Sequence, residues 1–397
     1  MATRNNNFIQ QSLEIAKQFT KSDFGIALII TLIWKIILVT IGYSIDSTHG
    51  GAASILDHTI RWDAGWYQIV IADHYQTNLA SAAFYPLFPI LVSAIHVISL
   101  GLFDIPLSGQ IINTAAVWFA LAALLKLGHI LLPTEKKYWL VILLLSAPAA
   151  FFLHVFYGEA IFIALSFWAY LFALKRQWLI MALLLGLLTA SRLPALLIIG
   201  LCGLEYLRSY HWKIKDAFNK NVLYFLFVPL GFIAYALYLF LAHHNALAMF
   251  SAYKATSDWS YQIFNPNVIE TIGKSAYQIV RLANSTRPFD NDLIVNNLFP
   301  LASILLLGLT SLYLTFKQKG KYLPLGVTGL ISIIMFTLNS NVVSVHRYVL
   351  PCLAIYVALA LLIKGRFKIL LLILCCGIGI AAQMYLYFLF INTIFAG

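Results

Sequence analysis

Four charged side chains lie in or beside apolar stretches of the chain, where charges are rare: Asp63, Glu159, Arg192 and Arg347. A charge at bilayer depth costs about 2.5–3.5 kcal/mol on insertion scales, so such residues usually have a function or a partner. A carboxylate can act as a general base toward a hydroxyl group. The planar guanidinium of arginine matches the geometry of a phosphate. These residue types predict proton abstraction beside a bound anion.

Asp63 stands in the stretch HTIRWDAGWY, which is too polar to cross a membrane. Aromatic and apolar residues follow at close to helical spacing, which predicts a helix on the membrane surface with its aromatics among the headgroups. Here Asp63 would be the general base at the mouth of a cavity, with Arg61 and Trp62 as weaker substrate-binding candidates. The alternative is that Asp63 lies on the wet face of the helix and pairs with Arg61.

Glu159 and Arg192 lie in two turns, YGE and SRLP, between short apolar segments. Ionised groups at such a depth are tolerated where they face protein or a water-filled cavity. They therefore predict a polar cavity that opens to the outer side, where Glu159 assists the acceptor and Arg192 binds an anion. Tyr157 is a weaker candidate in the first turn. The alternative is a structural ion pair of Glu159 and Arg192 with each other or with His154.

His346 and Arg347 form a second anion-binding candidate, at a point where the chain re-enters an apolar run beside Tyr348. Two arginines near one pocket suit a phosphate. The alternative is that these side chains only reach for the membrane interface. Tyr348 is a weaker substrate-binding candidate, and so is Lys254 in the outer segment 243–292.

Composition places these residues in a membrane protein. The 397 residues are 61% hydrophobic and 10% charged, with a mean hydropathy of +0.85, whereas soluble domains are about one quarter charged. Many apolar runs separated by short basic clusters predict an all-α helical bundle, with residues 1–397 as one integral domain. The net charge of +11 is explained by basic cytoplasmic loops and membrane lipids, and we expect no nucleic-acid partner.

The basic clusters fall at alternate ends of the apolar runs, which predicts a cytoplasmic N-terminus. The first apolar run lacks a cleavage site and is expected to be retained as a span. Residues 84–103 must then be an interfacial or re-entrant helix, because another crossing would place the later basic loops outside. The outer segments are residues 44–108 and 243–292. The eleven expected spans are 24–43, 109–131, 138–156, 159–174, 178–190, 193–209, 222–242, 293–316, 322–339, 348–364 and 368–391.

Five sequence blocks resemble the PIG-V family of mannosyltransferases, in particular its shorter prokaryotic members. In order they are RWDAGWYQIVIADHY, AAFYPLFPIL, HVFYGEAIFIALSFWAY, ASRLPALLI and HRYVLPCLAIYVALA. The resemblance covers residues 55–360 and implies the GT-C architecture. That architecture has multispanning helices, surface helices after the first span and a catalytic acidic residue in the first outer loop.

The resemblance assigns roles to residues of this chain. The family's Trp-Asp falls on Trp62-Asp63, its Tyr/Phe-x-Glu on the turn that ends at Glu159, its Ser/Thr-Arg on Ser191-Arg192 and its Arg-Tyr on Arg347-Tyr348. It implies a polyprenyl- or dolichyl-phosphate sugar as donor and a glycolipid or another extracytoplasmic acceptor. No cofactor is expected, although the lack of a tight Asp-x-Asp motif leaves a divalent metal requirement open.

The predicted function is an inverting glycosyltransferase, with mannose as the sugar, in a prokaryotic plasma membrane and with its active site on the extracytoplasmic face. Asp63 would be the base, while Arg192, Arg347 and His346 would hold the donor phosphate. Two other classes stay open from the sequence. One is a transporter or flippase of lipid-linked sugars, which predicts polar residues through both halves of the membrane. The other is a non-catalytic subunit of a glycolipid pathway.

Overall fold

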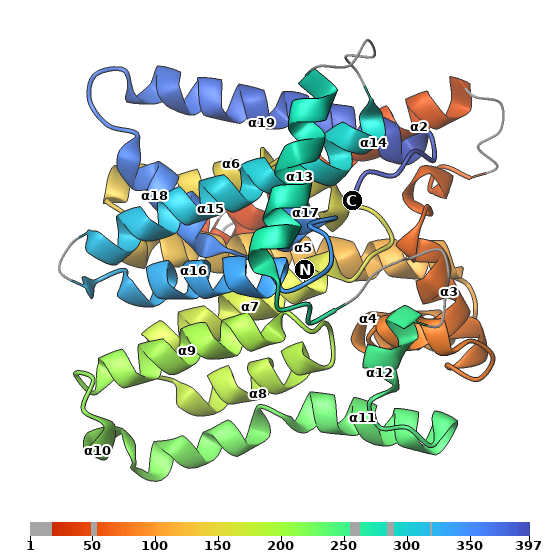
Figure 1. The fold of residues 1–397 in the computed structure, drawn as a ribbon, viewed down its shortest axis with the longest axis horizontal. Helices are drawn as coiled ribbons and strands as arrows, with labels where there is room; N and C mark the ends of the chain where they lie inside the picture. The colour runs from red at the N-terminus through yellow and green to blue at the C-terminus, as the bar shows by residue number, and fades with distance from the viewer. Residues whose placement is uncertain (1–17, 49–53, 255–262, 284–289, 318–319) are drawn as a thin grey trace, which may run out of the picture.

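The computed structural model describes residues 18–48, 54–254, 263–283, 290–317 and 320–397, and every regular element in these ranges is helical (Figure 1). Five helical segments are long and apolar enough to cross a membrane. They are α2 (Asp23–Thr48), α5 (Ile105–Leu131), η5 with α11 (Lys220–Phe227 and Leu230–His243), α14 and η7 with α15 (Asn291–Leu293, Ile294–Leu298 and Phe299–Phe316), and α19 (Lys368–Ile391). The all-α prediction is confirmed at this level.

The other six segments expected as crossings contain shorter helices, of 7 to 16 residues. They are α6 (Trp139–Leu145), α7 (Glu159–Leu174), α8 (Trp178–Thr189), α9 (Ala195–Ser209), α16 (Leu323–Thr337) and α18 (Leu353–Leu362). All six fall short of the roughly 17–25 residues of a complete crossing. The structure therefore supports five crossings by length and composition. The count of eleven crossings stays a prediction.

The segment 138–156 shows why one expected span is incomplete. Its helix α6 ends at Leu145, and the chain then turns before the 3-10 helix η4 (Ala150–Leu153). Pro148 lies in this turn. Proline lacks the backbone N–H of a helix and disfavours helical conformation at the residue before it. The irregular backbone that follows carries Tyr157 and leads into Glu159.

Helix α5 is the central long helix. The side chain of Asp104 accepts a hydrogen bond from the N–H of Leu107 at 2.8 Å, and a proline occupies the first turn, so the helix has a defined start. Its most apolar stretch is 56% buried, against 17% for α19. Helix α5 packs against α2 and α7. It therefore forms the interior of the bundle, while α19 presents most of its surface to the surroundings.

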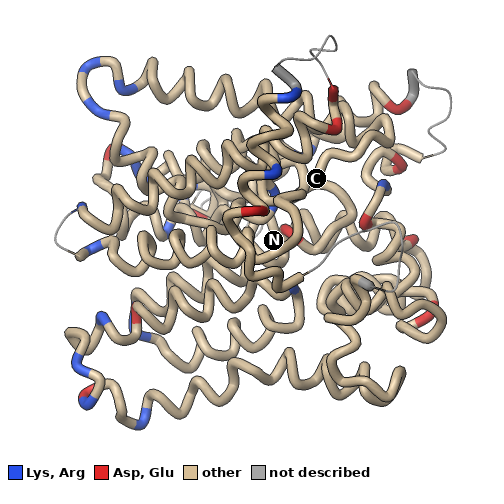
Figure 2. Tube along the Cα trace, in the orientation of Figure 1, with Lys and Arg blue, Asp and Glu red and all other residues tan. Residues whose placement is uncertain are grey.

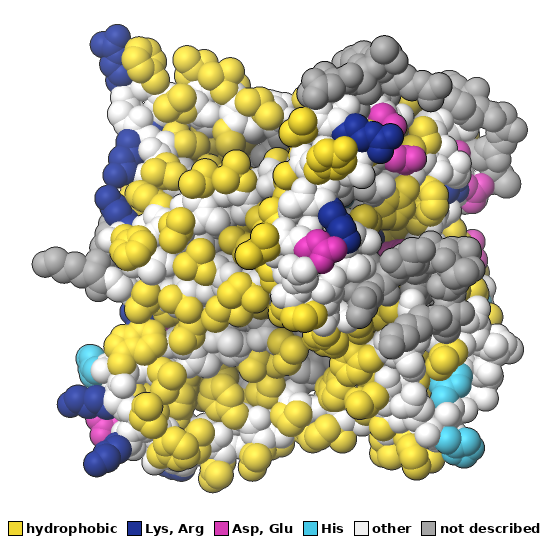
Figure 3. Space-filling view, in the orientation of Figure 1, with side chains coloured by type: hydrophobic (Ala, Val, Ile, Leu, Met, Phe, Trp, Pro, Cys, Tyr) yellow, Lys and Arg dark blue, Asp and Glu magenta, His cyan; other side chains and the backbone are white. Residues whose placement is uncertain are grey.

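The charge distribution separates the two ends of the bundle. Lys and Arg gather at the left-hand loops of Figure 2, whereas most acidic residues lie in the right half. Hydrophobic side chains cover much of the visible face between these ends (Figure 3). An apolar flank between two polar ends is typical of a protein that lies in a bilayer.

The remaining elements, apart from α13, are short and lie mainly at the end with few basic loops. The segment after α2 holds η1 (Asp57–Thr59), α3 (Asp63–Asp73), η2 (Leu79–Ala83) and α4 (Leu87–Ile98), the last within the expected interfacial range 84–103. It is joined to α11 by Tyr235, whose hydroxyl donates to the carbonyl of Ala82 at 2.8 Å. The others are η3 (Thr134–Lys136), α10 (Ile214–Ala217), α12 (Ala248–Ser251), η6 (Ala252–Lys254), α13 (Val268–Ala283) and α17 (Val345–Tyr348).

Candidate active site

A cavity of about 530 Å³ lies where the first surface segment meets the turns that precede α9 and α18. Its lining includes three of the four charged residues singled out from the sequence, namely Asp63, Arg192 and Arg347. Other polar groups come from α3, η6, α14, η7 and the segment after α16. They are Tyr67, Tyr253, Asp292, Asn296, Asn339, Asn341 and Ser344.

Asp63, Glu159, Arg192 and Arg347 form one continuous chain of ion pairs, here called the acid–arginine cluster. Arg347 Nη2 lies 2.9 Å from Asp63 Oδ2, and Arg347 Nε lies 3.0 Å from Glu159 Oε1. The same Glu159 oxygen accepts a hydrogen bond from Arg192 Nη1. Two acids and two arginines give a formal charge of zero. This balance lowers the cost of burying four ionised groups.

The cluster divides into an exposed and a buried part. The side chain of Asp63 is 29% exposed and faces the cavity with Arg192, whereas that of Glu159 is 4% exposed and does not line the cavity. Glu159 Oε2 has no hydrogen-bond partner among the described residues, and the 3.0 Å contact with Arg347 Nε lacks hydrogen-bond alignment. Glu159 thus contacts both arginines behind the cavity wall, and Asp63 is the carboxylate of the cluster that is accessible from the cavity.

Tyr157 positions the start of α3 and with it Asp63. Its hydroxyl accepts a hydrogen bond from the N–H of Asp63 at 3.0 Å and donates to the carbonyl of Arg61 at 3.1 Å. Between these residues Trp62 has a φ of +53°. A non-glycine residue in such a conformation costs about 1–3 kcal/mol and persists only where its surroundings enforce it. The buried tyrosine thus fixes the strained turn that presents the carboxylate.

Tyr348 lies between the two arginines of the cluster. The guanidinium carbons of Arg192 and Arg347 lie 5.5 Å and 5.4 Å from its ring centroid. Arg347 also contacts the rings of Phe152 and Tyr157, at 5.2 Å and 5.4 Å. Cation–π contacts of this kind hold a guanidinium without using its N–H donors. The aromatic residues therefore fix the orientation of the arginine planes.

Two pairings considered from the sequence are wrong. Arg61 does not pair with Asp63: it lies 2.9 Å from Asp46, at the end of α2, and donates to the carbonyls of Asp57 and Ile60. The reason is the turn at Trp62, since Asp63 lies on the far side of it, beside Arg347. Trp62 itself is 44% exposed and stacks edge-on against Phe395.

His154 pairs with His58 at 3.2 Å between the two Nε2 atoms, and not with Glu159. The other structural pairing, of Glu159 with Arg192, is present, and it lies at the wall of the cavity rather than apart from it.

His346 is buried and does not line the cavity. Its Nε2 lies 2.8 Å from the carbonyl oxygen of Ala396. Burial lowers the pKa of His346 to about 4, and the charge of Arg347 acts in the same direction. The imidazole is therefore neutral near pH 7 and adds no positive charge for an anion. The placement favours a structural role, in contrast to the phosphate contact expected from the sequence.

Lys254 ends η6, next to the cavity-lining Tyr253, and its side chain lies outside the described residues. In the described ranges no group of three His, Cys, Asp or Glu side chains is arranged to hold a metal ion. The described lining of the cavity contains carboxylates, arginines, amides and hydroxyls.

Several site residues were missed in the sequence. Asp292 and Asn296 give no signal there, because they precede an apolar run as an ordinary helix start would. The carbonyl of Gly397 accepts a hydrogen bond from Arg347 Nη1 at 2.9 Å, and Phe395 and Gly397 line the cavity. A backbone carbonyl has no side-chain signature. Asp46, at the polar end of the first apolar run, could have been proposed as a partner for Arg61.

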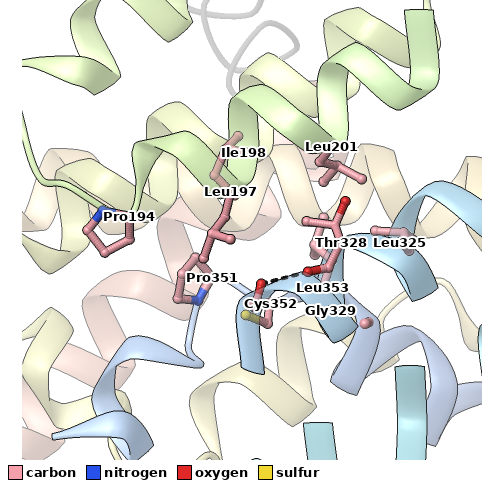
Figure 4. Close-up of a pocket in the computed structure, with 12 residues that line it drawn as sticks. Pro194, Leu197, Ile198, Leu201, Leu325, Thr328, Gly329, Pro351, Cys352 and Leu353 are labelled. Atoms are coloured by element: carbon pink, nitrogen blue, oxygen red, sulfur yellow. Dashed lines mark hydrogen bonds between the residues drawn. The ribbon is translucent and has the colours of Figure 1, made fainter. Parts of the chain in front are cut away.

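A narrow apolar pocket of about 20 Å³ adjoins the cavity, and Pro194 lines both spaces. Leu197, Ile198 and Leu201 reach it from α9, and Leu325, Thr328 and Gly329 from α16, with Pro351, Cys352 and Leu353 between them (Figure 4). The pocket therefore follows the seam between two apolar helices, away from the charged wall.

No protein-family model matches the chain, and no curated protein matches its sequence significantly. The resemblance to PIG-V mannosyltransferases stays a prediction, so the functional argument depends on the geometry of the cavity.

Proposed function

We propose that the protein is an inverting glycosyltransferase of the GT-C type. It would use eleven membrane crossings, with the cavity on the extracytoplasmic face, to move a hexose, expected to be mannose, from a polyprenyl phosphate to a lipid-linked or other acceptor. One observation carries the proposal: a carboxylate and two arginines share the wall of one cavity beside an apolar seam. This combination suits a hydroxyl, a phosphate and a hydrocarbon chain at once.

Each reacting group would have a counterpart in the cavity. Asp63 would accept the proton of the acceptor hydroxyl while the oxygen of that hydroxyl forms a bond to the anomeric carbon. The bond between that carbon and the phosphate oxygen would break, and the oxygen would leave with the electron pair. A single displacement of this kind inverts the anomeric configuration, as in the opposed-face logic of inverting glycosidases. Arg192 and Arg347 would neutralise the charge that develops on the departing phosphate.

The ion pairs suggest an order of binding. In the free protein Arg347 Nη2 lies 2.9 Å from Asp63 Oδ2, so this carboxylate oxygen is already engaged in an ion pair. A lipid phosphate that binds Arg192 and Arg347 would compete with Asp63 for the same N–H donors. Donor binding would therefore release Asp63 as a base, so the acceptor is deprotonated only when a donor is present.

The apolar seam supports a lipid donor. The narrow pocket starts at Pro194, two residues from Arg192, and continues along α9 and α16 between apolar side chains. An isoprenoid chain whose phosphate lies at Arg192 would extend into this seam. At about 20 Å³ the pocket is smaller than one isoprene unit, so α9 and α16 must separate slightly to admit the chain.

The test is direct. Purified protein in detergent or nanodiscs is incubated with polyprenyl-phosphate mannose and candidate acceptors, either glycolipid, inositol lipid or peptide. Loss of the donor together with a mannosylated product supports the proposal. Movement of intact donor between leaflets without cleavage would instead indicate a flippase. Activity that disappears in EDTA and returns with Mg²⁺ or Mn²⁺ would add a metal to the site.

A further inference from the structure

Helix α13 (Val268–Ala283) differs from the other long helices in direction. It crosses in front of α15 and α16, almost perpendicular to them (Figure 1). Its contacts lie at one end of these helices, since α13 packs against η7, which precedes α15, and the hydroxyl of Thr271 donates to the carbonyl of Asn339, just after α16. The opposite ends of α15 and α16 carry Lys317 and Lys321. Helix α13 thus lies at the end of the bundle away from a basic loop.

Three faces follow from the helical positions and burial of its residues. The buried face contains Thr271 and Ser275, with Ile272 and Ile279 half-buried. A second face is exposed and apolar, here called the apolar stripe: Ile269, Gly273, Ala276, Tyr277 and Val280. A third face is exposed and charged, with Glu270, Lys274 and Arg281. Residues three and four positions apart share a face of a helix, so each set forms a continuous row.

The apolar stripe of α13 is on the exposed side of the helix, whereas a helix in a soluble protein has its apolar stripe on the buried side. There the apolar side packs on the core and the polar side meets water. Here two hydroxyl side chains face the protein, while Ile269 is 86% exposed, Tyr277 67% and Val280 58%. An apolar row beside a charged row on the outer surface of a helix is typical of one that lies in the headgroup layer of a bilayer.

The neighbouring helix indicates what covers the stripe. Helix α15 contacts α13 and exposes Leu305 and Leu309 along its flank, and hydrophobic side chains cover this face of the molecule (Figure 3). Because α15 is long and apolar enough, with the preceding segment, to cross a membrane, its exposed flank belongs in the bilayer. Helix α13 contacts α15, so its exposed apolar stripe lies beside a helix with a lipid-facing flank, and its charged face adjoins the stripe.

We infer that α13 is an interfacial helix that binds the lipid surface, with the apolar stripe in the acyl boundary and Lys274 and Arg281 at the headgroups. The inference does not depend on glycosyl transfer. It has a consequence for the cavity, because Phe264 before α13 and Asp292 after it both line the cavity. Helix α13 therefore holds one rim of the cavity at the level of the lipid headgroups.

Site-specific fluorescent labels test the inference in proteoliposomes of phosphatidylcholine and phosphatidylglycerol. Single cysteines are introduced as Ile269→Cys, Ala276→Cys and Val280→Cys on the stripe, and as Lys274→Cys and Arg281→Cys as matched controls on the charged face. The background replaces the native cysteines by alanine: Cys202, Cys352, Cys375 and Cys376. All five introduced positions are exposed, so labelling is compatible with folding, and a monodisperse elution profile verifies it.

We expect stripe labels to emit at shorter wavelength and to be quenched by lipid-borne nitroxides, at a depth of about 5–10 Å below the headgroups. Labels on the charged face should be quenched by aqueous iodide. Equal iodide quenching of both sets would overturn the inference, because the stripe would then face water. Stripe labels that neither quencher reaches would also overturn it, since another protein would cover the stripe.

Discussion

Two buried polar clusters border the segment that runs from η4 to α7, and they differ in charge balance and in access. The acid–arginine cluster has two acids and two arginines, and three of the four, Asp63, Arg192 and Arg347, line a cavity. The second, here called the lysine–histidine cluster, consists of Lys35, His58, Gln110 and His154. Lys35 Nζ lies 3.2 Å from Gln110 Oε1, and Gln110 Nε2 donates to the carbonyl of His154 at 2.8 Å. None of these four residues lines the cavity.

The difference suggests that one buried polar cluster can take part in a reaction while the other only stabilises the fold. Two ionised pairs beside a cavity can exchange partners with a ligand, because a phosphate or hydroxyl can replace one member. A lysine that contacts an amide and a carbonyl, beside two imidazoles, holds neighbouring segments together and does not line the cavity. We therefore expect substitutions in the acid–arginine cluster to change turnover and binding, and those in the lysine–histidine cluster to change stability.

The largest effect is expected for Asp63→Asn. The amide is nearly isosteric with the carboxylate but cannot take up the acceptor proton, so turnover should fall by at least about a hundredfold. The measurement is the initial rate of product formation with polyprenyl-phosphate mannose. Asp46→Asn is the matched control, because Asp46 is ion-paired with Arg61 and lies outside the cavity lining. Wild-type turnover in Asp63→Asn would remove this residue from the reaction.

Arg192→Ala should weaken binding of polyprenyl phosphate, the sugar-free product. Loss of a charge-assisted contact removes about 1.5–3 kcal/mol, or roughly ten- to a hundredfold in affinity. Glu159 keeps Arg347 as a partner, so the variant should fold. Arg192→Lys should recover only part of the affinity, since the ammonium keeps the charge but loses the fork.

The control for Arg192→Ala is Arg208→Ala. Arg208 is paired with the buried Glu205 at the other end of α9 and lies outside the cavity lining. Binding that is indifferent to Arg192 but weaker in Arg208→Ala would place the phosphate at the opposite end of the molecule.

The burial of His346 predicts that the free energy of unfolding falls in acid. Its pKa is lowered to about 4 by burial, whereas an unfolded histidine titrates near 6.5. The stabilisation is complete above pH 6.5 and is lost as the pH falls toward 4, by about 2 kcal/mol at pH 5. His346→Gln should flatten the decline in thermal unfolding temperature between pH 7 and 5. The exposed His244, replaced by Gln, is the control and should leave the decline unchanged.

The sequence predicted the members of the acid–arginine cluster better than their contacts. Charges in or beside apolar runs are costly, so Asp63, Glu159, Arg192 and Arg347 could be identified one by one. Their connection through Arg347 depends on how α3, α7 and α17 pack, and no local pattern encodes that packing. For the same reason the alternative pairing of Asp63 with Arg61 is wrong, since the turn at Trp62 lies between these two residues.

The fold was likewise predictable in part: the long membrane helices could be identified from the sequence, and the bounds of the shorter elements could not. Long apolar runs gave the five segments that can cross a membrane, because hydropathy and length decide that property. The shorter segments depend on breaks such as Pro148, and α13 was not predicted at all. Its apolar residues Ile269, Ile272, Ala276, Ile279 and Val280 recur at helical spacing, so the helix could have been predicted from the sequence. Which of its sides faces the protein is known only from burial.

The smallest effect on activity is expected for Lys35→Met, which completes the comparison. Methionine fills a similar volume and relieves the desolvation of a buried ammonium, while Gln110 Oε1 loses its donor at a cost of about 1–3 kcal/mol. These contributions oppose each other, so the thermal unfolding temperature should shift little and turnover should stay near that of the wild type. The carbonyl of His154 keeps its bond from Gln110, so the backbone before Tyr157 stays in place. If Lys35→Met folds normally but loses turnover, the lysine–histidine cluster acts on the reaction through Tyr157 and Asp63, and the division between the two clusters is wrong.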